Sequence, residues 1–139
     1  GLPGLPIKIA RPDLKMLLID SIRKKTSMTD MFAQHTGLKD VTVLNTRAED
    51  LAGEPHYQHA FDVIISRAVA KVDLLVDWVY PMMKPNAVCA FLKGGDLSEE
   101  IAEAIANHPG LSVQEIQIEM FGIPWFVEDQ KKVVLCRFA

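Results

Sequence analysis

The sequence predicts an α/β domain in which a mostly parallel sheet carries helices on both faces. Segments whose apolar residues have helical spacing alternate with segments that have the apolar runs of strands along most of the 139 residues. This alternation is typical of βα units. The run 61–65 contains three consecutive β-branched residues without polar alternation, which favours a strand covered on both faces. Two strand-like segments without a helix between them close the chain.

Six strands and four helices are expected from these patterns. The strands are expected at 15–19, 41–44, 62–65, 87–92, 112–118 and 132–138. The helices are expected at 7–10, 21–37, 71–82 and 96–108. The connections between them are expected to include a loop at 53–59, a turn at 83–86 and an aromatic-rich hairpin connection at 121–126.

Proline, serine and glycine residues set the predicted helix boundaries. Pro6 suits the first turn of a helix, where its missing N–H costs nothing, and the helix stops before Pro12. Ser21 is a suitable N-cap for the second helix, and Gly37 is a suitable residue at its end. In the last helix, four apolar residues share one face at helical spacing: Leu97, Ile101, Ala104 and Ile105.

Composition narrows the class of protein. The net charge of −3 leaves no global basic field, so any RNA-binding surface must be a local patch or lie elsewhere in a longer protein. We find no apolar run of about 20 residues and no signal-peptide pattern, and we expect a cytoplasmic protein with no membrane partner. Cys89 and Cys136 lie in apolar runs and are interpreted as buried thiols in a reducing compartment. The four histidines show no ligand spacing, so we expect no metal site.

Polar residues at two predicted strand ends are the candidate binding residues. Arg67 follows the buried strand at 62–65, and ligands in open α/β sheets bind outside the carboxyl ends of the strands. Asp20 follows the strand at 15–19, 19 residues after Gly1, and an acid at this spacing from a glycine turn is typical of ribose binding. The alternatives are a solvated arginine and a helix-capping aspartate.

Six segments carry a resemblance to a known family and cover nearly the whole chain. They are GLPGLP at 1–6, IARP at 9–12, LIDS at 18–21 with Lys24 and Lys25, RAED at 47–50, ISRA at 65–68 and LKG at 92–94. In these segments the chain resembles the glucose-inhibited division protein B family. These proteins are bacterial methyltransferases that act on guanine N7 of 16S, or small-subunit, ribosomal RNA.

The resemblance implies a class I methyltransferase fold with S-adenosylmethionine as methyl donor and the small-subunit RNA or its particle as partner. In that fold the last strand runs antiparallel between its two predecessors, which would place Cys136 beside Cys89. The resemblance also implies donor-binding residues, which are Gly1 and Leu2 at the glycine motif, Asp20 with Ser21 at the ribose, Ala48 and Glu49 at the adenine, and Arg67. Lys93 is a candidate contact to the guanine. No general base is expected, because guanine N7 carries no proton.

The chain departs from the family pattern in two places. The family motif begins with a strand and two glycines that would precede Gly1, so we expect residues 1–139 to form one methyltransferase domain that is N-terminally truncated, lacks its first strand and is itself inactive. Lys131 and Lys132 stand where the family usually has Arg-His. A nicotinamide-dependent oxidoreductase and a non-catalytic nucleotide- or donor-binding domain remain the alternative interpretations.

Overall fold

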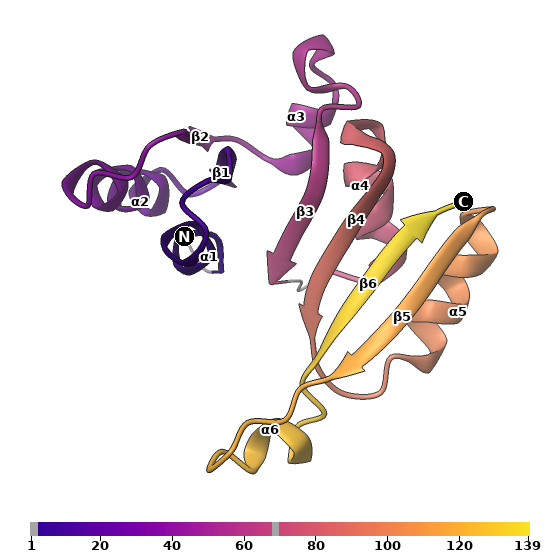
Figure 1. Cartoon of the computed structure of the whole chain (residues 1–139). Coiled ribbons are helices and arrows are strands. Elements are labelled where there is room, and N and C mark those ends of the chain that lie inside the picture. Colours follow the sequence, from indigo (N-terminus) through magenta and orange to yellow (C-terminus); the bar gives the residue numbers. More distant parts are fainter. Residues whose placement is uncertain (1–2, 68–69) are drawn as a thin grey trace. The chain divides into compact units, whose positions relative to one another are not determined.

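The computed structural model describes residues 3–67 and 70–139 and divides the chain into two compact units (Figure 1). The first unit is Gly1–Leu51 and the second is Ala52–Ala139. None of the helices in the described ranges is both long and apolar enough to cross a membrane. Gly1 and Leu2, two of the predicted donor-binding residues, lie outside the described residues.

The first unit is a two-stranded parallel sheet with helices. Its elements in chain order are α1 (Gly4–Ala10), β1 (Met16–Asp20), α2 (Arg23–His35), β2 (Val41–Asn45) and the start of α3 (Ala48–Ala52). The ladder pairs Asp20 with Asn45, so the carboxyl ends of both strands lie at one edge. The Lys8 side chain is fully buried, and its ammonium donates to the carbonyls of Pro12 and Leu14. Because these carbonyls belong to the α1–β1 connection, Lys8 fixes how the chain enters β1.

The second unit is a four-stranded mixed sheet with helices. Its elements are a 3-10 turn (Pro55–Tyr57), β3 (Phe61–Arg67), α4 (Val72–Val79), a 3-10 turn (Tyr80–Met82), β4 (Met83–Lys93), α5 (Ser98–Asn107), β5 (Leu111–Gln117), α6 (Trp125–Glu128) and β6 (Lys132–Phe138). The strand order is β3-β4-β6-β5. The last strand, β6, runs antiparallel to both of its neighbours, and Cys89 pairs with Cys136. This confirms the predicted placement of the last strand.

The two helices α4 and α5 of this unit lie on the same face of its sheet (Figure 1). Right-handed crossovers that proceed in one direction along a sheet place their helices on one face, so helices on both faces are not seen within this unit. Among the described residues of this unit, seven fully buried apolar residues form the centre of the core: Val72, Val76, Cys89, Phe91, Ala104, Val134 and Cys136. They come from α4, β4, α5 and β6.

The predicted turn at 83–86 is wrong, because these residues begin β4. Phe61 pairs with Met83 and Val63 pairs with Val88, so β4 holds extra residues at this point and bulges. Asn86 has a positive φ of 66° there, which asparagine tolerates better than most residues. The Pro-Asn sequence therefore forms a bulge within a strand and not a turn before it.

Two helical predictions also need correction. Ile105 is 47% exposed, whereas Leu97 and Ala104 are buried, so the apolar face of α5 is narrower than its sequence suggests. The predicted hairpin connection does join two antiparallel strands, but it contains the short helix α6 (Trp125–Glu128).

Candidate functional site

Asp20 ends β1 and is held in place by local backbone contacts. One carboxylate oxygen, Oδ1, accepts the N–H of Ile22 at 2.8 Å. Ile22 is the N-cap of α2 and makes no side-chain cap, so the predicted capping role of Ser21 is wrong. An aspartate that bonds the backbone two residues ahead forms an Asx turn, and this turn orients the half-buried carboxylate at the strand end.

The end of β2 is tied to the end of β1 at the same edge. The Asn45 side-chain amide and the Thr46 N–H each donate to the Asp20 carbonyl oxygen, both at 3.0 Å. Ala48 and Glu49 follow directly and open the short helix α3. Asp20 and Ser21 therefore lie at the carboxyl end of β1, and Ala48 and Glu49 follow the carboxyl end of β2 at the same edge. Their contact with a methyl donor stays a prediction.

Glu49 is one of two exposed acidic residues in the first turn of α3, the other being Asp50. The Glu49 carboxylate lies 3.8 Å from the Arg47 guanidinium, and both side chains are substantially exposed. An exposed pair at this distance contributes about 0–1 kcal/mol of stability. The carboxylate therefore has little structural task in the first unit.

Arg67 and Lys93 end neighbouring parallel strands of the second unit. Arg67 is the last residue of β3 and pairs with Leu92, and Lys93 is the next residue of β4. The Arg67 side chain is exposed, whereas only 8% of the Lys93 side chain is accessible. Two cations thus stand at the carboxyl edge of this sheet, and only one of them faces solvent.

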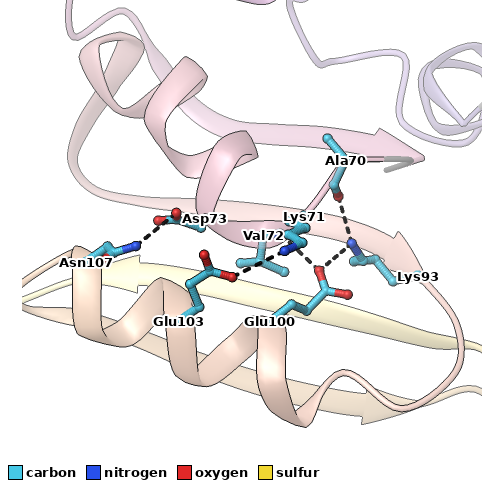
Figure 2. Close-up of polar contacts among 8 residues, drawn as sticks. All are labelled: Ala70, Lys71, Val72, Asp73, Lys93, Glu100, Glu103 and Asn107. Carbon is cyan, nitrogen blue, oxygen red and sulfur yellow. Dashed lines mark hydrogen bonds and ion pairs between the residues drawn. The ribbon is translucent and has the colours of Figure 1, made fainter.

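The Lys93 ammonium is held inside a polar cluster between β4, α4 and α5 (Figure 2). It donates to the Ala70 carbonyl at 2.8 Å and to Glu100 Oε2 at 2.7 Å. The same carboxylate oxygen accepts the Val72 N–H at 3.0 Å, which caps the start of α4. Lys93 and Glu100 therefore join the end of β4 to the first turns of both helices. A contact between Lys93 and a guanine stays a prediction.

Another polar cluster, which the sequence did not predict, joins the start of α4 to the end of α5, and Figure 2 shows its contact between Asp73 and Asn107. His108 Nε2 lies 2.8 Å from Asp73 Oδ1 and 3.3 Å from Asp77 Oδ1, and the Asn107 amide donates to Asp73 Oδ2 at 3.1 Å. Asp73, Asp77 and His108 are the group of potential metal ligands that the described residues bring together. Spacing in the sequence does not indicate this contact, because Asp73 and His108 are 35 residues apart.

His108 Nε2 lies 3.2 Å from the Asp73 carbonyl oxygen, and this contact joins the end of α5 to the start of α4. Asp73 Oδ1 is a buried side-chain oxygen that has no hydrogen-bond partner among the described residues. The two carboxylates and the imidazole have the chemistry of metal ligands, so the expected absence of a metal site stays a prediction.

Comparison with known proteins shows the family of the chain. The family model for GidB, described as rRNA small subunit methyltransferase G, matches residues 1–131. The ribosomal RNA small subunit methyltransferase G of Roseiflexus sp. (strain RS-1) is 34% identical over 139 residues, which is 100% of this chain and 59% of the relative. The protein of the same name from Brevibacillus brevis is 39% identical over 121 residues, covering 87% of this chain and 51% of the relative. The chain thus spans about half the length of the curated relatives it matches.

Solved structures agree with the fold. An rRNA methylase from Streptococcus thermophilus matches with a TM-score of 0.63 and 11% identity, covering 89% of this chain and 73% of that one. The cyclase SpnF matches with a TM-score of 0.69 and 12% identity, covering 99% of this chain and 71% of that one. Identities this low show the fold alone, which is the α/β fold of class I methyltransferases. The match of the family model over residues 1–131 shows more: the chain belongs to the GidB family, rRNA small subunit methyltransferase G.

Proposed function

We propose that this chain forms part of an enzyme that transfers a methyl group from S-adenosylmethionine to N7 of a guanine in 16S ribosomal RNA. One observation supports this most directly: the family match over residues 1–131 includes polar residues that the structure places at the carboxyl ends of parallel strands. Ligands of open α/β sheets bind at such ends. An enzyme with this substrate would work in the cytoplasm, where ribosomal RNA is found.

The residues at the end of β1 and β2 fit the nucleoside part of the donor. The Asp20 carboxylate is fixed by the Ile22 N–H through one oxygen, and a carboxylate is an acceptor for the two hydroxyls of a ribose. Ala48 is small, which leaves room for a flat base, and Glu49 can accept from an exocyclic amine. When bound, S-adenosylmethionine supplies a methyl group on a positively charged sulfur, which makes that methyl electrophilic.

Guanine N7 sets modest demands on the protein. It carries an in-plane lone pair and no proton, so the attack on the methyl group needs no general base. The protein then contributes by holding the two reactants close and aligned, and alignment alone can supply several kcal/mol of rate enhancement, with an upper range of about 7–11 kcal/mol. The exposed Arg67 is proposed to contact the donor site, as the family arginine does.

Equilibrium titration of the full-length protein with S-adenosylmethionine and with NAD tests this function against its alternatives. Saturable S-adenosylmethionine binding together with methylation of small-subunit RNA is the expected result. Binding of S-adenosylmethionine without methylation of free RNA or of assembled particles would instead indicate a non-catalytic binding domain. Preferential NAD binding would indicate an oxidoreductase.

A further inference from the structure

The connection between β5 and β6, residues 118–131, carries apolar side chains that point to solvent, and we call it the β5–β6 hairpin. Phe121 is fully exposed, and Met120, Trp125 and Val127 are each about half exposed. Trp125 stacks on Phe126 with ring centroids 4.4 Å apart and ring planes 23° apart. Exposed groups of aromatic and methionine side chains are typical of interaction sites.

Backbone hydrogen bonds within the β5–β6 hairpin hold it in one conformation. Ile118 N–H donates to the Lys131 carbonyl and Lys131 N–H donates to the Phe126 carbonyl, both at 2.8 Å. Asp129 N–H donates to the Trp125 carbonyl at 2.9 Å. A surface that is already folded loses little conformational entropy when it binds a partner. The exposed apolar groups are therefore presented in a fixed arrangement.

Strand directions place the hairpin at the edge of this sheet where Arg67 and Lys93 end β3 and β4. β4 and β5 are both antiparallel to β6 and hence parallel to each other, so the hairpin follows β5 at the edge where β4 ends (Figure 1). Gly95 N–H donates to the Asp129 carbonyl at 3.2 Å, and a Cβ added at Gly94 would lie 3.2 Å from that same oxygen. The hairpin therefore packs against the glycines that directly follow Lys93.

The charge around the apolar group selects the kind of partner. Glu119, Glu128 and Asp129 are exposed carboxylates of the hairpin, against the single cation Lys131 within it. A negative rim repels the phosphates of a nucleic acid and attracts cationic side chains. Apolar side chains with such a rim match a protein surface in which lysine and arginine surround an apolar residue.

We propose that the β5–β6 hairpin docks a basic protein surface beside the site. The inference rests on the proposed function. An RNA substrate that is bound to a basic protein would bring both the RNA and the basic protein surface to this edge. The inference adds to the proposed function that the enzyme recognises protein as well as RNA. Phe121 and Trp125 make the apolar contact with that protein.

Fluorescence of Trp125 tests this proposal in the full 139-residue chain. A Trp78→Phe substitution leaves Trp125 as the only tryptophan. The probes are a short peptide that repeats lysine, leucine, arginine and glycine, the same peptide with glutamate at the cationic positions, and a single-stranded oligoribonucleotide. We expect a saturable blue shift with the basic peptide, and no saturable change with the other two probes.

Two substitutions connect the signal to the hairpin. Phe121→Ser should weaken binding of the basic peptide about tenfold or more, because aromatic anchors carry much of the energy of such contacts. Ile105→Ser is the matched control, since Ile105 is an exposed apolar residue on α5, and it should leave binding unchanged.

Three outcomes would overturn the proposal. They are no binding of the basic peptide, equal binding by the Phe121→Ser variant, and saturable quenching of Trp125 by the oligoribonucleotide, which would make the hairpin an RNA contact. The readout needs neither methyl donor nor turnover. A failure of methylation in the separate titration therefore concerns the proposed function and not the hairpin.

Discussion

Asp20 shows how one residue can serve both the fold and the site. Its Oδ1 accepts the Ile22 N–H, and its carbonyl accepts bonds from Asn45 and Thr46. The two bonds to the Asp20 carbonyl do not depend on the side chain, and a substitution removes only the bond from Ile22. A substitution of Asp20 should therefore affect ligand binding more than the fold.

Asp20→Ala in the full-length protein should weaken S-adenosylmethionine binding by roughly 1.5–3 kcal/mol, the range for hydrogen bonds to a charged group. This corresponds to about 10- to 150-fold in the dissociation constant, measurable by isothermal titration calorimetry. Asp30→Ala, on the exposed side of α2, is the control and should leave the affinity unchanged. Equal affinity in the Asp20 variant and the parent protein would place the ribose elsewhere.

Arg67→Ala should lower donor affinity or the methylation rate and leave the thermal midpoint of unfolding within about 1–2 °C of the parent. The reason is that the Arg67 side chain is exposed at the end of β3 and away from the core, and exposed substitutions usually change stability by less than about 0.5 kcal/mol. Thermal unfolding measures the midpoint, and a donor titration with a methylation assay on the same samples measures the affinity and the rate. An unaltered rate and affinity would remove Arg67 from the site.

At the scale of elements, helix α5 makes one largely buried ion pair and one exposed ion pair, and the two can be compared directly (Figure 2). Glu100 pairs with the largely buried Lys93 and also caps α4, whereas Glu103 pairs at 3.6 Å with the exposed Lys71. Removing one partner of a buried pair leaves an uncompensated charge, but an exposed pair contributes little.

Glu100→Ala should therefore lower the free energy of unfolding by about 2–4 kcal/mol, and Glu103→Ala by less than about 1 kcal/mol. Urea denaturation of the two variants followed by circular dichroism measures the difference. Similar losses in both variants would mean that the Lys93–Glu100 pair is no more stabilising than a surface contact.

The same scale shows how far the sequence predicted this structure. Apolar runs predicted the six strands that the described residues form. A strand that is buried on one or two faces is rich in apolar residues whichever strand it pairs with, so its own residues are enough to identify it. The start of β4 was missed because Pro85 and Asn86 have turn chemistry, and only the pairing with β3 shows that they form a bulge. The Lys93–Glu100 contact has no sequence signal of its own, since the helix start that Glu100 caps lies 28 residues away.

The site was predicted less completely than the fold. Strand ends identified Asp20 and Arg67 as candidates, and parallel pairing brings Asp20 beside the segment of Ala48 and Glu49. Lys93, the candidate contact to the guanine, is largely buried, because its ammonium donates to the Ala70 carbonyl and the Glu100 carboxylate. Such burial depends on how two helices pack, which local sequence does not encode.

At the scale of the whole molecule, the two buried thiols make stability depend on pH. Burial raises the pKa of Cys89 to about 12 and that of Cys136 to about 11, from an ordinary value of 9.0, and the neighbouring Cys136 adds to the shift of Cys89. The native protein then keeps thiol protons that the unfolded chain loses above pH 9. The thiol contribution to stability is complete below that pH and is lost as the pH rises toward the native pKa values.

The free energy of unfolding should therefore fall between about pH 9 and pH 11, by at most about 1.4 kcal/mol per pH unit for each thiol. Urea titrations at several pH values measure this slope. The double variant Cys89→Ala, Cys136→Ala is the control, since lysine and tyrosine ionise in the same range and only the thiol part should disappear. An unchanged slope in that variant would show that the thiols do not contribute.

The chemistry of the proposed reaction gives the other pH prediction. Because guanine N7 needs no general base, the methylation rate of the full-length enzyme with saturating RNA should be nearly flat between about pH 6.5 and 8.5. Single-turnover kinetics across this range is the measurement. A steep rise through one ionisation, in a step shown to be chemistry, would point to an essential base and a different target atom.

The position of β6 in the sheet affects how the second unit folds during synthesis. β5 reaches β4 only through β6, which occupies Lys132–Phe138 and follows β5 in the sequence. During synthesis β3 and β4 can pair early, but β5 has no neighbour in the sheet until β6 has been made. Until then a growing chain would hold an unpaired β5 and an uncovered edge of β4, and both are liable to pair with other chains. The sheet of this unit is therefore closed between β4 and β5 by a strand that is made after both of them.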